Sequence, residues 1–366
     1  MRKRIIGFRA SLQGMLGFFV ALAIVASLKF TSSFIQPFVI ALLLSFILNP
    51  LVEFFVRIHV PRFLAIILVI VILMGFSILI GLVLFESVNS LVAEYPKYQD
   101  RFFIVVDFFV ETFNLPGDFV TQFEIPRTLA SLLVNVSSGL FGFLGNVALT
   151  LVFLLFIMME KPFIKIKLRE ALKHERTEKI GKIFANVNRH VGRYLLIKFF
   201  VSFLTALIVF TVFSTIGVDF PFIWGLLTFL FNFIPTIGSI LISAISILFA
   251  LIQFFPDWNP IILAGIGMII PQLVIGNILD PKLTGDSLNL SPVVILLALL
   301  LWGWLWGTSG LFLAVPLTVG IKIAFEYIPG LEFLGVLMGT GTKPAPVLLD
   351  EGPPNSHDEV SEDHLE

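Results

Sequence analysis

The sequence predicts an all-α, polytopic membrane protein with seven or eight transmembrane segments. The chain has 366 residues, of which 57% are hydrophobic and 13% are charged, whereas soluble domains carry about 25% charged residues. Charge-free runs recur, and about 20 apolar residues in a helix cross the hydrocarbon core. These runs are 10–28, 30–52, 63–85, 128–159 and 199–218. A further region, Pro221 to Pro329, is almost uncharged but is interrupted by nine prolines.

The distribution of charge predicts the side of the membrane on which each loop lies. Residues 161–198 contain eleven Lys and Arg against three Glu, a net charge of +8. Residues 86–127 contain seven acidic and three basic residues, a net charge of −4. Because short loops rich in Lys and Arg stay in the cytoplasm, we predict that the N-terminus and 161–198 are cytoplasmic and that 86–127 is external. We interpret 10–28 as an uncleaved span rather than a signal peptide, since its removal would break this alternation.

The external segment 94–135 is amphipathic rather than spanning. Four apolar residues share one stripe of a predicted helix: Phe102, Val106, Phe109 and Phe113. This pattern is typical of a helix that lies in the membrane interface or packs on the outer mouth of a bundle. A role in binding a partner is the alternative.

Two further segments complete the predicted organisation. The basic segment 161–198 is predicted to be helical, either as a topology determinant with a solvated face or as a surface that binds anionic lipid. Residues 339–366 are rich in Pro, Asp and Glu, which predicts a disordered acidic tail. The remaining residues, 1–338, are predicted to form one transmembrane domain.

Several function classes are excluded by composition. The chain has no cysteine and five histidines, so disulfides, Cys-ligated zinc and thiol catalysis are excluded. The sequence contains no nucleophile–base pair, no histidines at metal-ligating spacing and no nucleotide-binding loop. We therefore expect no enzyme activity, no cofactor, no metal and no nucleic-acid partner.

The first of three clusters in the Pro221–Pro329 region ends in Asn232-Phe-Ile-Pro235-Thr-Ile-Gly238. The uncharged run around it, 222–256, would measure about 50 Å as a straight helix, so it must tilt, break or fold back. Pro235 lacks a backbone donor and frees a carbonyl one turn earlier. Asn232 lies beside that gap, where it either forms a polar notch or repairs the break.

The second cluster contains Gln272, Asn277, Asp280 and Lys282. An acidic and a basic residue drawn into the membrane would mark a functional site, because burying them in lipid is costly. At a surface they would form an ordinary loop. The sequence alone favours the loop.

The third cluster contains Trp302, Trp304 and Thr308. Tryptophans are common in the aromatic belts at membrane interfaces, but these lie near the middle of the uncharged run 293–321. Thr308 has a hydroxyl that either binds a solute or bonds back within its own helix. For each residue alone, packing is the favoured interpretation. The sequence leaves open whether 222–255 and 293–327 cross once or fold back.

Together the three clusters resemble the AI-2E family of bacterial inner-membrane proteins. The matching pieces are Trp224-Gly225 with Asn232-Phe-Ile-Pro235-Thr-Ile-Gly238, Gly276-Asn277-Ile-Leu-Asp280-Pro281-Lys282 with Gly285, and Trp302-Gly-Trp304 with Gly307, Gly310 and Ala314-Val-Pro316-Leu317. A basic segment after the fourth span also fits, and the resemblance covers 10–330. It implies a transporter-like fold of about eight segments in the bacterial inner membrane, assembled as a homo-oligomer such as a pentamer.

The resemblance favours export of a small polar solute such as autoinducer-2, because members with an acidic residue before the proline, here Asp280, look like exporters of that signal. The expected partners are this solute and membrane lipids. The substrate path is predicted to include Asn232, Pro235, Gly238, Gln272, Asn277, Asp280, Lys282, Trp302, Trp304 and Thr308. One alternative is a monovalent cation/proton antiporter that titrates Asp280 or Asp219. The other is a non-transporting scaffold or stress factor.

Overall fold

The computed structural model describes residues 15, 17, 19–20, 22–114, 125–171, 174–284, 289–328 and 330–341. The first cations, Gly285 and the tail beyond position 341 lie outside these residues. In the described chain every regular element is a helix, and seven helices are long and apolar enough to cross a membrane. The predicted all-α polytopic fold is confirmed.

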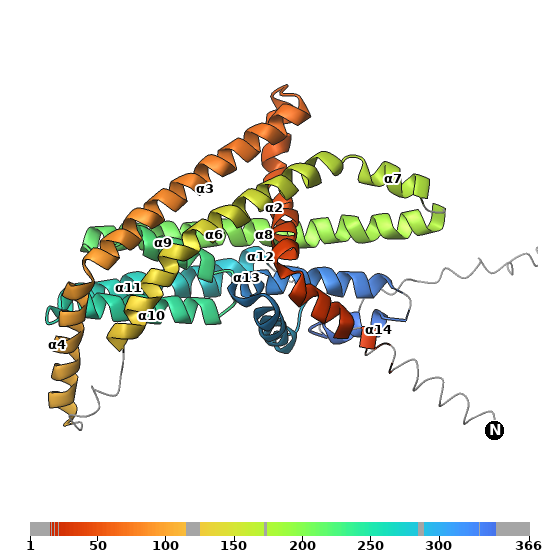
Figure 1. Cartoon of the computed structure of the whole chain (residues 1–366). Coiled ribbons are helices and arrows are strands. Elements are labelled where there is room, and N and C mark those ends of the chain that lie inside the picture. Colours follow the sequence, from red (N-terminus) through yellow and green to blue (C-terminus); the bar gives the residue numbers. More distant parts are fainter. Residues whose placement is uncertain are drawn as a thin grey trace, which may run out of the picture.

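Figure 1 shows the described helices in order along the chain. They are α2 (Ser32–Arg57), α3 (Arg62–Ala93), α4 (Tyr95–Phe113), α6 (Ile125–Glu160), α7 (Ile164–Ala171), α8 (His174–Ile216), α9 (Pro221–Phe231), α10 (Ile237–Phe254), α11 (Trp258–Val274), the π-helical segment η1 (Ile275–Leu279), α12 (Asp280–Thr284), α13 (Pro292–Tyr327) and α14 (Glu332–Leu337).

Helices α2, α3 and α6 pack together at one side of the bundle. Their contact is built on small or branched side chains, including Ala41, Ala65 and Val69, which leave room for Leu154. The described chain from 22 to 57 is helical apart from Thr31, whose N–H donates to the Ser27 carbonyl at 2.9 Å. No loop therefore separates the predicted runs 10–28 and 30–52 in this part of the chain.

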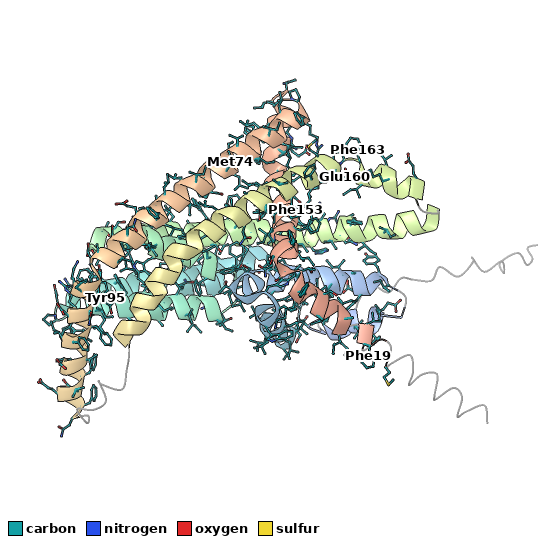
Figure 2. The ribbon with its side chains drawn as sticks, viewed as in Figure 1. Phe19, Met74, Tyr95, Phe153, Glu160 and Phe163 are labelled. Carbon is teal, nitrogen blue, oxygen red and sulfur yellow. The ribbon has the colours of Figure 1, made fainter. Side chains whose placement is uncertain are left out.

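Large apolar side chains cover the outside of the bundle (Figure 2). Met74 on α3 projects outward and is 44% exposed, and Leu300 on α13 is 71% exposed. A contiguous apolar exterior is rare on soluble proteins and marks a membrane or partner surface. This exterior is the surface that a bilayer would cover.

Helix α8 is the longest element, with 43 residues that extend for about 64 Å at ~1.5 Å per residue. Its apolar part begins at Ile183. Residues 183–198 of the predicted basic segment therefore lie in the same membrane-length helix as the apolar run 199–218.

Helices α9 and α10 form a hairpin, so the segment 222–255 folds back instead of crossing once. The rings of Trp224 and Phe249 lie 5.1 Å apart, and Gln253 Nε2 donates to the Gly217 carbonyl at 2.8 Å. The two ends of 222–255 are therefore adjacent. At the tip, a Cβ on Gly238 would lie 1.8 Å from the Phe231 carbonyl oxygen, so the close turn requires glycine.

Helix α13 also folds back on itself. Gly307 interrupts it with φ 62° and ψ −141°. The Trp302 indole donates to Thr318 Oγ1 at 3.3 Å, although these residues would be about 24 Å apart in a straight helix. Both halves contribute to one core cluster, in which Leu299 and Trp302 meet Val315 and Val319.

In the sequence, one continuous helical stretch separates the two folded-back segments. It runs from Trp258 to Thr284 and is formed by α11, η1 and α12. It begins where the Asp257 carboxylate accepts from the Asn259 N–H at 3.2 Å, an N-cap arrangement. The loop predicted around Asp280 and Lys282 is wrong, because both residues lie in α12 and within this membrane-length stretch. Pro281 lies inside this stretch, directly after the π-helical segment η1, so the helix continues past a residue that has no N–H to donate.

Helix α4 packs on the base of the α9–α10 hairpin. Tyr98 lies 5.2 Å from the Phe249 ring and Phe108 lies 5.0 Å from the Phe255 ring. A helix is confirmed at Tyr95–Phe113, and Phe102, Val106 and Phe109 of the predicted stripe are half-buried on its packing face. Tyr98 and Val105 complete that face as its buried residues, and only Phe113, the last residue of the helix and of the predicted stripe, is 65% exposed.

Candidate functional site

A polar cavity of about 210 Å³ lies where three parts of the chain meet. Its lining comes from α8, from the tip of the α9–α10 hairpin and from the α11–α12 stretch. The lining residues are Lys198, Val201, Asn232, Ile234, Pro235, Thr236, Ser239, Gln272, Gly276, Asn277 and Asp280. Five of the ten residues predicted for the substrate path are therefore brought together here.

A buried ion pair forms one wall of the cavity. Lys198 Nζ on α8 lies 2.6 Å from Asp280 Oδ2 on α12, and the two side chains are only 10% and 19% exposed. Removing two charges from water costs several kcal/mol per ion unless they compensate each other closely. Ionisable pairs inside membrane bundles commonly mark substrate or ion pathways.

The helix that carries Asp280 is irregular at this point. The Asp280 N–H bonds to the Ile275 carbonyl, a π-helical register, and π-bulges recur at functional sites. Pro281 has no N–H, so it cannot supply the usual partner of the Asn277 carbonyl. Asn277, which lies within this π-helical segment, lines the cavity.

Gln272 supplies an amide donor that lacks a partner. It lies eight residues before Asp280, about 12 Å along the helix, and its Nε2 is buried with no hydrogen-bond acceptor among the described residues. Among the described residues, the buried hydroxyls of Ser202 and Thr228 also have no hydrogen-bond partner. These residues lie one turn from Lys198 and Asn232 respectively. Buried polar groups without a hydrogen-bond partner are rare in proteins and require an explanation. A polar ligand that bonds to them would be such an explanation.

The hairpin tip meets the cavity in a strained conformation. Thr236 has φ 61° and ψ −55°, and the Ile237 N–H donates to the Pro235 carbonyl at 2.6 Å. This is the rare form of the γ-turn, and a β-branched residue at positive φ is an outlier. Such strain is concentrated at binding and switch sites.

The other predicted residues lie away from the cavity. The Lys282 side chain is exposed, and Gly238 packs inside the tip. Trp302 is buried against Thr318. Trp304 is 60% exposed and lies beneath Lys29 Nζ, which is 3.8 Å from its ring centroid. Thr308 is exposed.

Lys198 is the functional candidate that the sequence reasoning missed. It was counted among the cations of 161–198, yet it follows Tyr194-Leu-Leu-Ile and precedes two phenylalanines. A single lysine within such an apolar stretch is the signal that could have singled it out. The lysine that the sequence paired with Asp280 was Lys282 instead.

The cavity lies well inside the bundle along α8. Asn186 donates to the Tyr327 hydroxyl near the end of α13, and Lys198 follows twelve residues later, about 18 Å along the helix. Ile216, the last residue of α8, lies about 27 Å beyond Lys198. The base of the α9–α10 hairpin is at that far end.

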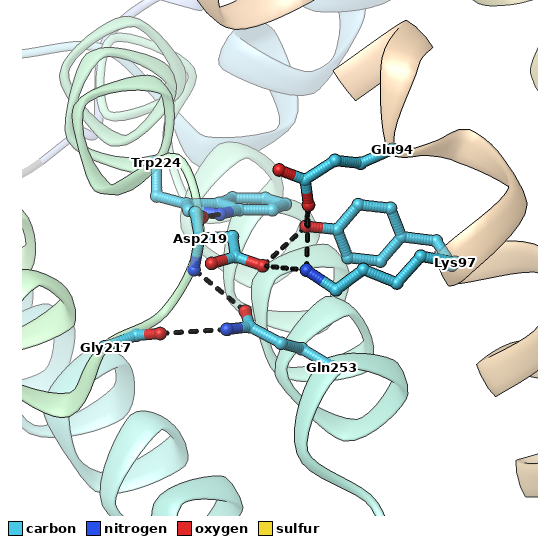
Figure 3. Close-up of polar contacts among 7 residues, drawn as sticks. Glu94, Lys97, Gly217, Asp219, Trp224 and Gln253 are labelled. Atoms are coloured by element: carbon cyan, nitrogen blue, oxygen red, sulfur yellow. Dashed lines mark hydrogen bonds and ion pairs between the residues drawn. The ribbon is translucent and has the colours of Figure 1, made fainter. Parts of the chain in front are cut away.

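Asp219, the second carboxylate considered for titration, belongs to a separate network at the hairpin base (Figure 3). It accepts from the Tyr98 hydroxyl at 2.6 Å and lies 3.3 Å from Lys97 Nζ. Its N–H donates to Gln253 at 2.8 Å. These contacts fasten α4 to the hairpin, so Asp219 has a structural role and lies outside the cavity.

This network shifts two pKa values upward. The pKa of Lys97 is raised, chiefly because it donates a hydrogen bond to Glu94 and is attracted by Asp219. Burial raises the pKa of Tyr98 well above its usual range, and the hydrogen bond to Asp219 adds to the rise. Tyr98 is therefore held in its neutral, donating form.

Replacing Tyr98 with Phe is expected to lower the free energy of unfolding by roughly 1.5 kcal/mol at pH 8, because a hydrogen bond to a charged group is lost. The folded pKa of Tyr98 is raised, so its contribution is complete below the unfolded pKa of about 10 and declines above it. The difference between wild type and Tyr98→Phe should therefore shrink at pH 11. Unfolding in mixed detergent micelles measures it, and an equal difference at both pH values would contradict the assignment.

A family profile and several known proteins match most of the chain. The profile described as AI-2E family transporter matches residues 16–330. The chain is 32% identical to the AI-2 transport protein TqsA of Escherichia coli over 329 residues, which cover 88% of this chain and 94% of that protein. It is 31% identical to a putative transport protein of Borreliella burgdorferi, with 87% and 88% covered. The putative transport protein YhhT of Escherichia coli is also 31% identical, with 87% and 91% covered.

The match includes all three parts of the chain that form the cavity, and the relatives are described as transport proteins rather than as enzymes. This agrees with a membrane bundle that encloses a polar cavity. The chain belongs to the AI-2E family of transporters.

Proposed function

We propose that this protein exports a small polar solute, such as autoinducer-2, across the bacterial inner membrane. The observation that carries the proposal is the cavity at the meeting point of α8, the hairpin tip and the α11–α12 stretch. At about 210 Å³ it is smaller than the 300–1,000 Å³ typical of sites for drug-sized ligands. It therefore suits a small solute, and one similar protein is an AI-2 transport protein.

The chemistry of the lining favours a neutral, hydroxyl-rich molecule. The amides of Asn232, Gln272 and Asn277 each offer donors and an acceptor. Lys198 and Asp280 neutralise each other, so the lining has no net charge to attract an ion. The unpaired Gln272 amide would donate to a solute oxygen.

We assign the other residues predicted for the substrate path either to packing that shapes the cavity or to positions at its entrance or at a subunit contact. Gly238 fixes the hairpin tip, and Trp302 ties together the two halves of α13. Trp304, Thr308 and Lys282 are exposed and would act at an entrance or a subunit contact. In this proposal the protein is a homo-oligomer, with the N-terminus in the cytoplasm and 94–135 outside. The part of the basic segment 161–198 that precedes Ile183, where the membrane-length part of α8 begins, is also cytoplasmic.

Export is tested by deleting the gene and measuring the partition of autoinducer-2 between cells and medium. Loss of extracellular signal, restored by the wild-type gene, is expected. An unchanged partition would remove autoinducer-2 as the substrate. Complementation with the cavity variants below then connects the site to the activity.

Replacing Gln272 with Leu is expected to separate stability from transport. The wild-type chain leaves the buried Nε2 unpaired, so its removal should leave stability unchanged or raise it by about 1–3 kcal/mol. Export should nevertheless fall about tenfold, the ratio that corresponds to ~1.4 kcal/mol of lost solute binding. Export assays and unfolding curves on the same variant measure both, and full export by a stable Gln272→Leu protein would contradict the site.

A second candidate is exchange of a monovalent cation for a proton, because the cavity contains a carboxylate paired with a lysine. Such a pair can open when a cation or proton replaces its partner. Asp280 is the titrating residue in this alternative, since Asp219 lies in the hairpin-base network. Dye-quench assays in inverted vesicles test it, and insensitivity to added sodium and lithium at every pH would reject it.

A further inference from the structure

A second cavity lies at the end of the bundle that carries the basic residues. It has a volume of about 540 Å³ and is formed by α2, α8 and α12. Its lining residues are Phe46, Asn49, Pro50, Asn188, Gly192, Arg193, Leu196, Ile197 and Leu283. It shares no lining residue with the cavity that contains the Lys198–Asp280 pair.

Two cations border this cavity. Arg193 lines it directly. Lys161 donates to Asn49 Oδ1 at 3.3 Å and lies 5.5 Å from the centroid of the Phe46 ring, so its ammonium group is placed against two lining residues. The neighbouring carboxylate of Glu53 pairs with Arg62 at 3.3 Å.

The electrostatics around Lys161 indicate a deficit of negative charge. Burial lowers the pKa of Lys161, and the nearby Arg62 lowers it further, against the opposing effect of Glu53. An anion bound beside Lys161 and Arg193 would relieve this repulsion. The other walls are apolar, from Phe46 to Leu283, and Leu283 is 44% exposed at the outer surface.

We propose that this cavity binds the phosphate headgroup of an anionic phospholipid, with Lys161 and Arg193 as its cationic ligands. Asn49 and Asn188 provide amide donors to the headgroup oxygens, and the apolar wall takes the first part of an acyl chain. Basic pockets between membrane helices on the cytoplasmic side recognise lipid headgroups in this way. A soluble anion would leave the apolar wall uncovered.

The position of the site gives the lipid a structural consequence. Ile197 precedes Lys198 in α8, and Leu283 lies three residues after Asp280 in α12. A lipid in this cavity therefore contacts both helices that carry the buried ion pair.

The test uses the delipidated full-length protein in dodecyl maltoside, with lipid binding followed by native mass spectrometry. Dioleoylphosphatidylglycerol should bind more tightly than dioleoylphosphatidylcholine. Lys161→Gln and Arg193→Gln should each weaken phosphatidylglycerol binding about fivefold, since each cation near a headgroup contributes ~1 kcal/mol. Arg189→Gln is the matched control, because Arg189 is exposed one turn earlier on α8 and does not line the cavity.

The charge-preserving variant Lys161→Arg should bind phosphatidylglycerol within about twofold of wild type, which separates loss of charge from loss of fold. Equal weakening by Arg189→Gln would mean diffuse attraction to the basic face and would overturn the site. Binding of phosphatidylcholine as tightly as phosphatidylglycerol would overturn the recognition of an anion. Displacement of the lipid by millimolar inorganic phosphate or glycerol 3-phosphate would overturn the assignment to a lipid.

Discussion

Replacing Asp280 with Asn is expected to destabilise the protein by about 3–5 kcal/mol, because it leaves the charge of Lys198 buried and uncompensated. Export should be lost in the same variant. The pair is short, at 2.6 Å, and both side chains are largely shielded from solvent. Unfolding in mixed detergent micelles and extracellular signal in a complemented deletion strain measure the two effects.

The double variant Lys198→Met with Asp280→Asn separates a structural from a functional role. Replacing both members of a buried pair with uncharged groups of similar size is often neutral or stabilising. The double variant should therefore recover most of the stability lost by Asp280→Asn. If the pair acts on the solute, export stays lost although the fold is restored.

Two outcomes would contradict this account. Wild-type export by the double variant would show that the charges serve only the fold. Wild-type stability of Asp280→Asn alone would mean that Lys198 is not buried against Asp280. Lys282→Gln is the control, because Lys282 is exposed on the same helix and should change stability by no more than ~0.5 kcal/mol.

The residue types at the candidate site could be predicted from the sequence, but the partner of Asp280 could not. Asn232, Gln272 and Asn277 stand out as polar residues in apolar surroundings, and they line the cavity. The ion pair joins positions 198 and 280, which are 82 residues apart. Adjacent charges suggested Lys282 instead, yet side chains two positions apart on a helix do not face each other.

The course of the chain through the membrane was only partly predictable for a related reason. Apolar runs identify the segments that are buried in lipid, and the runs at 63–85 and 128–159 became parts of α3 and α6. Hydropathy is the same for a helix that crosses and for one that turns back. The reversals depend on backbone contacts at Gly238 and Gly310, which a charge count does not detect.

Replacing Gly238 or Gly310 with Ala is expected to cost about 3 kcal/mol or more, at the upper end for added atoms in a packed core. A Cβ at Gly238 would lie 1.8 Å from the Phe231 carbonyl oxygen, and one at Gly310 would lie 1.8 Å from the Trp302 carbonyl oxygen. Both obstacles are backbone atoms, so no side-chain rotation relieves them. Gly265→Ala is the control, since beyond its own helical turn no atom of the described residues lies within 4 Å of its added Cβ.

The same three variants distinguish folded-back segments from straight crossings. In a straight helix Gly238 and Gly310 would be ordinary interior positions, where Ala is favoured over Gly by up to ~1 kcal/mol. Gly265, on α11, is such a position, and its Ala variant should be neutral or slightly more stable. The folded-back arrangement therefore predicts opposite signs for Gly238→Ala and Gly265→Ala in unfolding measurements. If all three variants were as stable as wild type, the hairpin tip that forms one wall of the cavity would not exist.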